Sequence, residues 1–129
     1  MSTSPPPGDL AIRTIAMPAD TNPAGDIFGG WLMSQMDLAG GQVALAMAKG
    51  RVATVAVDSM TFHEPVFVGD ELSCYAELLR VGLTSLRYRV TASVRHSEGR
   101  QHVNVTEGMN TYVAIDPNRK PRPVADRSQ

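Results

Sequence analysis

The sequence contains very little cysteine, few aromatic side chains and no apolar run of the kind that crosses a membrane. Cys74 is the only cysteine in 129 residues, so the chain cannot close an internal disulfide or build a cysteine-based zinc site. No stretch of about 18 uncharged apolar residues carries membrane-type flanks, and the N-terminus lacks the basic and apolar regions of a secretion signal. We therefore expect a cytoplasmic protein that does not enter a membrane.

A single globular domain fits the length and the composition. A chain of 129 residues with 43% hydrophobic and 19% charged residues can bury an ordinary core. The Pro- and Ser-rich residues 1–9 are predicted to form a flexible N-terminal segment, and residues 118–129 a tail with little regular structure. The folded domain is thus expected to span residues 10–117.

The charges are unevenly distributed along the chain, although the net charge is only −1. Residues 1–79 carry three basic and nine acidic side chains, whereas residues 80–129 carry nine basic and four acidic ones. Because no aromatic residues interleave with the basic ones in a stripe, nucleic acid is not an expected partner. A modest cluster of arginines would suit a polyphosphorylated small molecule, and a solvated, charged sheet face is the alternative.

The longest segment with a uniform pattern is residues 27–48, which is apolar on almost every side and contains no proline. This length and composition predict a helix that is enclosed by protein. Asp26 is the expected N-cap of this helix, and Lys49 with Gly50 forms its expected C-terminal stop.

Alternating apolar and polar residues follow Gly50 and predict four strands. These strands are residues 52–62, 70–81, 84–94 and about 103–115. In the last one, the odd-numbered residues from Val103 to Ile115 are expected to share one apolar face, with Glu107 as the exception. A further short strand at residues 10–17 precedes a loop at residues 18–26. The predicted class is α+β, with a curved antiparallel sheet of about five strands wrapped around one long central helix.

Asp37 is the most informative single residue, because it is the only charged side chain in the buried helix predicted for residues 27–48. Buried carboxylates are rare unless they are paired or functional. The small residues on the same helix face would let another backbone or an extended ligand approach closely; they are Gly30, Ser34, Gly40 and Gly41. The pattern favours a catalytic acid or base. A carboxylate that is solvated or paired at an interface is the alternative.

Gly29 and Gly30 lie where the helix is expected to begin, although each glycine weakens a helix by roughly 1 kcal/mol relative to alanine. Unencumbered amides at a helix N-terminus can bind an oxyanion or a polarised carbonyl group. Gly30 precedes Asp37 by two helical turns, roughly 10 Å, a distance that a flat acyl group could span. Close packing of the helix start against a strand is the alternative.

The remaining polar residues give weaker signals. Asn22 can orient a water molecule or a carbonyl group, or simply form a turn. The three histidines have no metal-ligand spacing, so no metal site is expected; they are His63, His96 and His102. Neither a nucleophile elbow nor a nucleotide-binding loop is present, and Cys74 is expected to be an inert core thiol. The segment from Gly82 to Ser85, beside two arginines, suits either a diphosphate or a plain hairpin turn.

Several motifs together resemble the YciA-type acyl-CoA thioesterases of the hotdog superfamily. The longest is MPADTNPAGDIFGGWLMSQMD at residues 17–37, and shorter ones lie at residues 50–52, 59–62, 65–70, 82–85 and 112–116. The resemblance extends over roughly residues 12–123. It implies a hotdog fold, an acyl-CoA substrate and no cofactor other than the CoA of the substrate itself. It further implies two protomers paired edge to edge, with dimers associating as a hexamer, a trimer of dimers.

The same resemblance implies roles for individual residues. Asp37 matches the catalytic carboxylate, Asn22 the residue that helps to place water or the thioester carbonyl, and Gly30 a backbone donor. The implied substrate-binding residues are Gly29, Met60, Gly82, Thr84 and Ser85. Asn22 and Asp37 of one site are expected to come from different protomers. Trp31, Met33 and Met36 are candidates to line the acyl tunnel, or to be ordinary core residues.

Some alternatives stay open at the level of sequence. Asp37 would act as a general base for water or as a nucleophile that forms a mixed anhydride. A non-catalytic acyl-CoA sensor on the same fold would need an output domain, for which we find no sequence. A hotdog dehydratase would need a histidine facing the acid, and residues 22–37 contain none. Thioester hydrolysis is therefore the expected activity.

Overall fold

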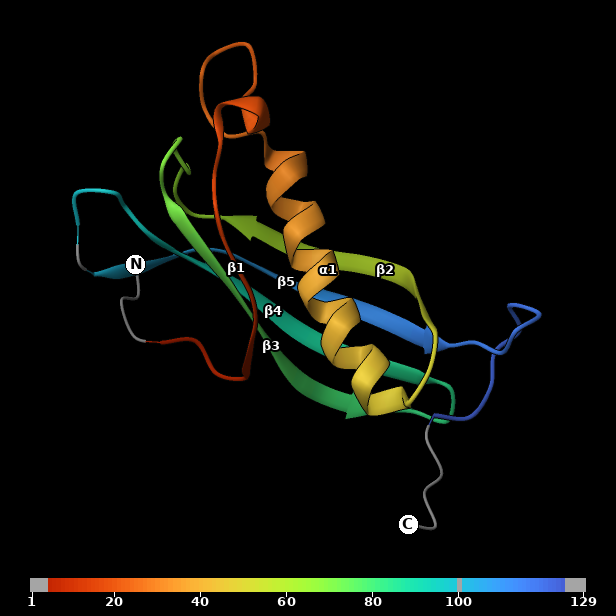
Figure 1. Cartoon of the computed structure of the whole chain (residues 1–129). Helices are drawn as coiled ribbons and strands as arrows, with labels where there is room; N and C mark the ends of the chain where they lie inside the picture. The colour runs from red at the N-terminus through yellow and green to blue at the C-terminus, as the bar shows by residue number, and fades with distance from the viewer. Residues whose placement is uncertain (1–4, 100, 125–129) are drawn as a thin grey trace.

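The chain folds as one antiparallel sheet with a single long helix across one of its faces (Figure 1). The computed structural model describes residues 5–99 and 101–124. The strands stand in the order β1-β3-β4-β5-β2, and all neighbours are antiparallel. The elements are β1 (Asp9–Ile15), the 3-10 helix η1 (Pro18–Asp20), α1 (Gly29–Ala48), β2 (Val52–Phe62), β3 (Glu71–Val81), β4 (Ser85–Arg95) and β5 (His102–Ala114). The predicted class, the helix and the five strands are confirmed.

The helix α1 begins two residues later than predicted, and Asp26 does not cap it. The N-cap is Phe28, whose side chain makes no capping hydrogen bond. Asp26 belongs instead to the preceding turn, where its amide donates to Asn22 Oδ1 at 3.2 Å. The amide of Ile27 donates to the carbonyl oxygen of Val66 at 3.1 Å. This bond ties the chain to a neighbouring loop just before the helix, so the first helical turn starts only at Gly29.

One side of α1 packs on the sheet, and the opposite side is exposed in the single chain. The buried helix residues are Leu32, Met36, Ala39, Gly40, Ala44 and Ala48. On the other side, Leu38 and Leu45 are 58% and 46% exposed. The prediction that protein encloses the helix is therefore wrong for one copy of the chain. The helix does end as predicted, with Lys49 in the left-handed region at φ 55°.

The last strand, β5, turns the opposite face to the core from the one predicted. Its register against β4 shifts between Ala92 and Ser93, where Val105 is the extra residue of a bulge. Beyond this bulge the odd-numbered residues up to Val113 are exposed or half-buried, and the buried residues are Thr106, Gly108, Asn110, Tyr112 and Ala114. A shift of one residue exchanges the two faces of a strand. The bulge thus brings Asn110 and Tyr112 under the helix.

The strand β2 forms one edge of the sheet, and among the described residues it pairs only with β5. Its apolar side chains are unusually exposed, with Val55 at 57% and Phe62 at 51%. A long apolar edge strand is an aggregation hazard unless another strand or element covers it. Both this edge and the open side of α1 therefore have the character of contact surfaces.

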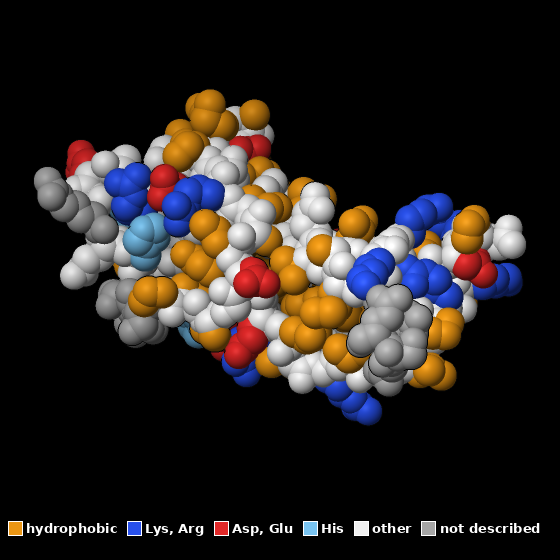
Figure 2. All heavy atoms as spheres, turned by 60° about the horizontal axis from the view of Figure 1, so that its bottom comes forward, with side chains coloured by type: hydrophobic (Ala, Val, Ile, Leu, Met, Phe, Trp, Pro, Cys, Tyr) orange, Lys and Arg blue, Asp and Glu red, His pale blue; other side chains and the backbone are white. Residues whose placement is uncertain are grey.

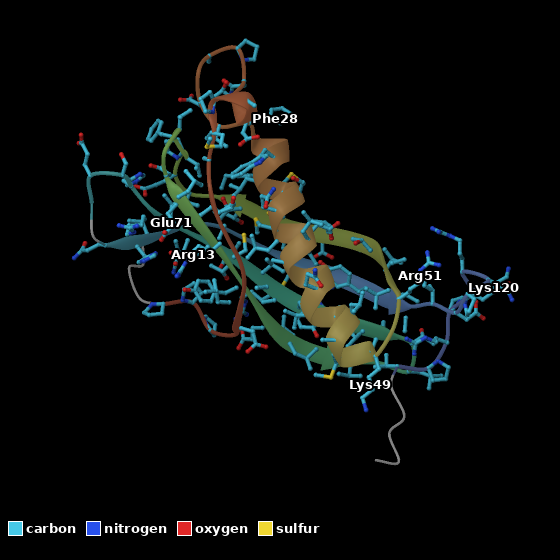
Figure 3. All side chains as sticks on the ribbon, viewed as in Figure 1. Arg13, Phe28, Lys49, Arg51, Glu71 and Lys120 are labelled. Atoms are coloured by element: carbon cyan, nitrogen blue, oxygen red, sulfur yellow. The ribbon has the colours of Figure 1, made fainter. Side chains whose placement is uncertain are left out.

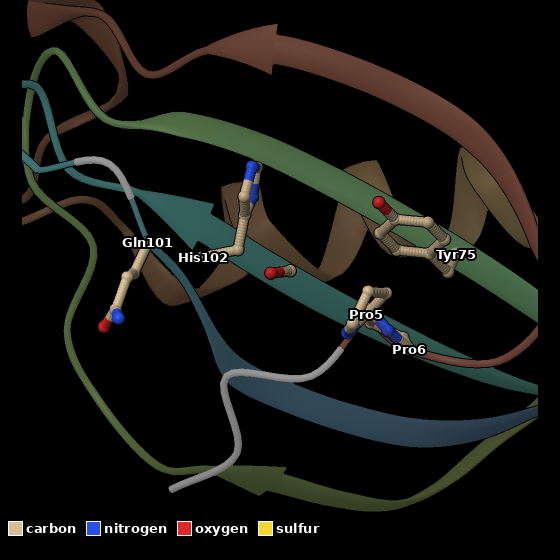
Figure 4. A pocket seen from close by; sticks show the side chains of 6 residues that line it. Pro5, Pro6, Tyr75, Gln101 and His102 are labelled. Atoms are coloured by element: carbon tan, nitrogen blue, oxygen red, sulfur yellow. The ribbon is translucent and has the colours of Figure 1, made fainter.

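The two ends of the described chain lie against the sheet. Pro5 and Pro6 lie on the face opposite α1, beside a cavity of about 170 Å³ that Tyr75, Ser93 and His102 also line (Figure 4). Near the other end, the guanidinium of Arg122 donates to the carbonyl oxygen of Ala48 at 3.0 Å. The amide of Val124 donates to Leu83 at 2.9 Å, so this segment covers the β3–β4 hairpin.

The surface shows no single basic face in the view of Figure 2, where hydrophobic side chains spread across the middle and lysines and arginines gather towards the two ends. The charge asymmetry along the sequence is therefore not gathered into one patch on that face. Within residues 5–99 and 101–124, no helix has the length and apolar character needed to span a bilayer.

Candidate active site

Asp37 lies near the middle of α1, on the side that faces the edge strand β2, and it is half-buried. Its Oδ1 accepts hydrogen bonds from Thr54 Oγ1 at 2.9 Å and from the Tyr112 hydroxyl at 3.1 Å. Thr54 and Tyr112 are direct partners in the β2–β5 register, which is why both reach the same carboxylate oxygen. The expectation of a buried acid is thus only partly met: the single chain leaves Asp37 accessible.

Tyr112 is the most buried member of this group, with only 1% of its surface exposed. Its hydroxyl lies 3.0 Å from the main-chain oxygen of Asp37 and accepts a hydrogen bond from Asn110 Nδ2 at 3.0 Å. A Cβ atom on Gly40 would collide with this hydroxyl. Gly40 was expected to admit another backbone or a ligand; the structure instead fills the space with the tyrosine of β5. Burial raises the pKa of the Tyr112 phenol, so it remains a hydrogen-bond donor at neutral pH.

A cleft of about 280 Å³ opens beside Asp37 between α1 and β2. Its helix wall continues from Asp37 to Gly41 and Leu45, which follow one another at intervals of one turn. Val52 and Thr54 form the strand wall. The cleft is therefore mainly apolar, with one anchored carboxylate at its end, which is the usual composition of a site for a small organic substrate.

Gly29 and Gly30 form the exposed start of α1, as predicted. The amides of Trp31 and Leu32 both donate to Phe28, so the regular helical bonds begin there, and no described residue accepts from the two glycine amides. A Cβ atom on Gly30 would lie 2.5 Å from the ring of Phe28. The glycine thus makes room for this ring, rather than for a packed strand. Figure 3 shows Phe28 at this end of α1 and Lys49 at the other.

Asn22 forms a tight turn before the helix, and the single chain does not bring its side chain to Asp37. Its Oδ1 accepts hydrogen bonds from the amides of Ala24 at 2.9 Å and Asp26 at 3.2 Å. Its own amide donates to the carbonyl oxygen of Asp26 at 2.7 Å. With Oδ1 engaged in the turn, the Nδ2 group is the part of the side chain that remains for a ligand; no described residue accepts from it.

The other predicted binding residues lie apart from Asp37 in the chain. Met60 is half-buried on β2 and packs on Gly108, whose missing side chain leaves it room. The segment from Gly82 to Ser85 forms the β3–β4 hairpin turn, closed by the Gly82 amide donating to Ser85 at 2.8 Å. Thr84 accepts from the amide of Ala114 at 2.9 Å, so this hairpin is at the end of the sheet where β5 ends. Of the tunnel candidates, Met36 is a core residue with no exposed surface.

Of the residues set aside at the sequence level, Cys74 lies in the core, as expected. Cys74 is buried, and burial raises the pKa of its thiol to about 12. Among residues 5–99 and 101–124 there is no group of three or more histidine, cysteine or carboxylate side chains that could hold a metal ion. His96 contacts the buried Asp70 at 3.0 Å, far along the chain from the site.

Sequence reasoning missed three residues of the site, namely Thr54, Asn110 and Tyr112. Thr54 and Asn110 are polar residues in strands, which the alternating pattern treats as ordinary outward-facing positions. Tyr112 was assigned to the wrong face, because the bulge at Val105 leaves no clear signal in the sequence. The sequence offers one hint: Asn110 and Tyr112, which both carry polar groups, are two positions apart and so share one face of the strand.

Comparisons with known proteins find relatives over most of the chain. The sequence profile of the Thioesterase superfamily matches residues 24–100. The acyl-CoA thioester hydrolase YciA of Escherichia coli K12 is 51% identical over 120 residues, which are 91% of each chain. A hexameric thioesterase from Yersinia pestis has a TM-score of 0.90 and 50% identity, covering 94% of this chain and 98% of that one.

A more distant structure is informative about ligands. An acyl-CoA hydrolase from Staphylococcus aureus, solved with butyryl-CoA, CoA and CoA disulfide, has a TM-score of 0.81 and 29% identity. The match covers 88% of this chain and 69% of that one. Further structures of that enzyme carry alanine in place of one asparagine, one aspartate or one threonine.

The chain therefore belongs to the thioesterase superfamily, and its fold is the hotdog fold of the solved relatives. Within this superfamily, the identity of half of its residues over nine-tenths of the chain makes it a member of the YciA-type acyl-CoA thioester hydrolases.

Proposed function

We propose that this protein hydrolyses acyl-CoA thioesters and that Asp37 is the reacting carboxylate. In the overall reaction, water delivers its oxygen to the carbonyl carbon, the carbon–sulfur bond breaks, and the sulfur leaves as the CoA thiol with a proton. The observation that carries the proposal is an accessible carboxylate anchored through Oδ1 at the end of an apolar cleft. Asp37 acts either as a general base for this water or as a nucleophile that forms a mixed anhydride.

The replaced residues of the Staphylococcus aureus enzyme support this assignment. Their asparagine, aspartate and threonine are separated by 15 and then 17 positions, the same intervals as Asn22, Asp37 and Thr54. Three residue types at two matching intervals make a chance agreement improbable. We therefore assign Thr54 to the site together with Asp37 and Asn22.

A second copy of the chain completes the site in this proposal. Asn22 does not reach Asp37 within one chain, and both the β2 edge and the open side of α1 lie beside Asp37 with exposed apolar residues. Pairing β2 of two copies would continue the sheet and cover these surfaces. Asn22 of one protomer would then present its Nδ2 group to the carbonyl or water at Asp37 of the other. Dimers would associate further, as the hexameric relatives do.

The amides of Gly29 and Gly30 are proposed to polarise the thioester carbonyl. Neither amide has an acceptor in the part of the chain that the structure describes, and both lie at the positive end of α1, where a developing oxyanion is favoured. Trp31, Met33 and Met60 are the proposed contacts of the acyl chain, because they are accessible or half-buried near the helix start or on β2, unlike the core residue Met36.

The phosphate groups of CoA are proposed to bind at the opposite end of the cleft. There, Lys49, Arg51 and Arg122 border a second cleft of about 250 Å³. Arg51 directly precedes Val52 in the wall of the first cleft, and Lys49 is one turn beyond Leu45, so the two clefts follow the same helix–strand boundary. Figure 3 shows Arg51 and Lys120 on this side of the molecule. The amide of Ile115 donates to the carbonyl oxygen of Arg51, and the amide of the preceding residue, Ala114, donates to that of Thr84. The hairpin turn with Gly82, Thr84 and Ser85 therefore lies at the same end of the cleft as Arg51.

The proposed reaction needs water and substrate only, with no metal or other cofactor, and it would take place in the cytoplasm. The donors and the carboxylate named above supply carbonyl polarisation and water activation, which are the two requirements of thioester hydrolysis.

The test is hydrolysis of acyl-CoA by Asp37→Asn. The amide is the same size and can still accept from Thr54 and Tyr112 through its oxygen, so the fold and the anchoring bonds are retained while the charge is lost. CoA release is followed with a disulfide indicator for acyl chains from acetyl to palmitoyl. We expect kcat to fall by about 1000-fold or more on every chain length.

A matched control is Asp58→Asn. Asp58 is a carboxylate of the neighbouring strand β2 and pairs with Arg87 on the outer face of the sheet at 3.1 Å. This variant should retain nearly wild-type kcat. If Asp37→Asn hydrolyses acyl-CoA at the wild-type rate, the assignment is refuted. If the wild-type protein binds acyl-CoA but releases no CoA, the non-catalytic sensor is favoured.

A further inference from the structure

The two oxygens of the Asp37 carboxylate are not equivalent. Oδ1 accepts two hydrogen bonds, one from Thr54 and one from Tyr112. No described residue donates a hydrogen bond to Oδ2. A carboxylate held through one oxygen keeps the lone pairs of the other for a water molecule or an electrophile. The arrangement therefore distinguishes a held oxygen from an oxygen that is available to react.

The side chain that holds Oδ1 from inside the protein is Tyr112. Its hydroxyl accepts from Asn110 Nδ2, which uses a phenol lone pair and leaves the phenol proton for Asp37. That proton is directed at the carboxylate Oδ1 and at the main-chain oxygen of the same residue, at 3.1 and 3.0 Å. One hydroxyl thus binds both the side chain and the backbone of Asp37, and fixes one relative to the other.

The approach of this hydroxyl to α1 depends on Gly40. Any larger residue would place a Cβ atom in collision with the hydroxyl, and within 3.0 Å of the ring carbon that bears it. A glycine in the middle of a helix costs roughly 1 kcal/mol relative to alanine, so this position carries a penalty that the contact with Tyr112 explains. The glycine, the tyrosine and the asparagine together form a built support beneath Asp37.

We propose that Tyr112 is a positioning residue for thioester hydrolysis, which holds Asp37 through Oδ1 so that Oδ2 is the oxygen that acts on water or on the thioester. The proposal rests on the proposed catalytic role of Asp37. Tyr112 touches no reacting atom; it acts through the carboxylate. Holding a reacting group in its productive orientation lowers the barrier of the chemical step without changing how tightly the substrate binds.

Tyr112 has a stronger hold on Asp37 than Thr54 has, because the two hydroxyls differ in their access to water. Thr54 is exposed, so water competes for its hydrogen bond, whereas Tyr112 is almost completely buried. Hydrogen bonds to a charged group are stronger where water is excluded. The loss of the tyrosine hydroxyl should therefore be the more damaging of the two.

The test is the kinetics of Tyr112→Phe, which keeps the ring over Gly40 and removes only the hydroxyl. We expect kcat to fall by about 10- to 100-fold, the size expected for one hydrogen bond to a charged group, while KM changes by less than about threefold. The matched control is Tyr88→Phe. Tyr88 is also buried, its ring packs edge-on against Tyr112 at 6.1 Å, and its hydroxyl has no hydrogen-bond partner among the described residues. Its kcat should be unchanged.

Two outcomes would overturn the proposal: a kcat of Tyr112→Phe within about twofold of wild type, or a rise in KM with kcat unchanged. If Asp37→Asn is inactive in the same assay, such a result removes the role of Tyr112 and leaves that of Asp37 intact. If Asp37→Asn is active, the proposed function itself fails.

A second variant covers the case in which Tyr112→Phe does not fold. Gly40→Ala retains the tyrosine hydroxyl but forces it away from Asp37, and alanine favours the helix. A lower kcat at unchanged KM would support the positioning role, and wild-type kcat would contradict it.

Discussion

Replacing Thr54 with valine tests the geometry of the site most finely, because it removes one hydrogen bond and almost no volume. Thr54 Oγ1 donates to Asp37 Oδ1 at 2.9 Å from the edge strand β2. In Thr54→Val the carboxylate keeps its second donor, Tyr112, so it should remain in place but rotate more freely. The expected result is a slower chemical step in a protein of nearly unchanged stability.

The magnitude follows from the exposure of Thr54. A hydrogen bond to a charged group contributes about 1.5–3 kcal/mol when it is sheltered from water, and less where water competes for the donor and the acceptor. Thr54 is exposed and Asp37 half-buried, so we take about 1 kcal/mol, which corresponds to about a fivefold decrease in kcat. The free energy of unfolding should change by no more than about 0.5 kcal/mol, as is usual at an exposed position.

The assay is CoA release under substrate saturation, with Thr54→Ser as the control that retains a hydroxyl at the same position. The serine variant should keep most of the wild-type kcat, and the valine variant should fall below it. Equal rates for the two variants would mean that the bond to Asp37 has no part in the reaction. A larger loss than that of Tyr112→Phe would reverse the proposed order of the two donors.

Two further predictions concern the substrate phosphates and the only thiol. Arg51→Ala should raise KM for acyl-CoA by about two- to fivefold, with kcat unchanged and a weaker dependence of KM on salt, because an exposed cation contributes modestly and through a screened interaction. The control is Arg13→Ala, whose guanidinium is engaged with Ser73 at the other end of the molecule, and which should leave KM unchanged. Cys74, with a thiol pKa of about 12, should not react with a disulfide indicator at pH 8 until the protein is unfolded; rapid reaction of the native protein would contradict its burial.

The same thiol makes the stability of the protein fall at high pH. Its pKa is higher in the folded protein than in the unfolded chain, so folding favours the protonated form. Its contribution is therefore fully present below the unfolded pKa, near 8.5, and is lost as the pH rises from there towards 12. At neutral pH the thiol is protonated in both the folded and the unfolded chain, so its contribution does not change with pH there.

The sequence allowed the fold to be predicted because its signals are local. A long apolar segment without proline predicts a helix, and alternation over 11 to 13 residues predicts the strands β2 to β5. Asp37 stood out for the same reason, since a single charge in an apolar segment is visible without any tertiary information. The error at the helix start is equally instructive, because the bond from Ile27 to Val66 is a contact between distant residues.

The rest of the site depends on contacts between distant residues, to which local patterns are blind. Tyr112 reaches Asp37 across 75 positions of sequence, and it does so only because the bulge at Val105 reverses the face of β5. The side chain of Thr54 is recognisable as functional only once β2 is known to pair with β5 in this register. Gly40 likewise makes room for the hydroxyl of Tyr112, and this role could be recognised only once the structure placed Tyr112 against it.

The incomplete enclosure of α1 has a different cause. A helix that is apolar on all sides indicates burial, but not whether the covering surface belongs to the same chain. The single chain leaves Leu38 and Leu45 exposed, and it leaves Asn22 apart from Asp37. Both features fit the proposal that a second copy of the chain covers α1 and supplies Asn22 to the site.

The most direct measurement is therefore activity in a mixture of two inactive variants, Asn22→Ala and Asp37→Ala, refolded together so that protomers exchange. If each site takes Asn22 from one copy and Asp37 from the other, every mixed dimer regains one intact site. Random pairing then predicts about a quarter of the wild-type activity per protomer, because half of the dimers are mixed and each has one working site of two. Activity no greater than that of the separate variants would contradict a carboxylate site shared between two copies of the chain.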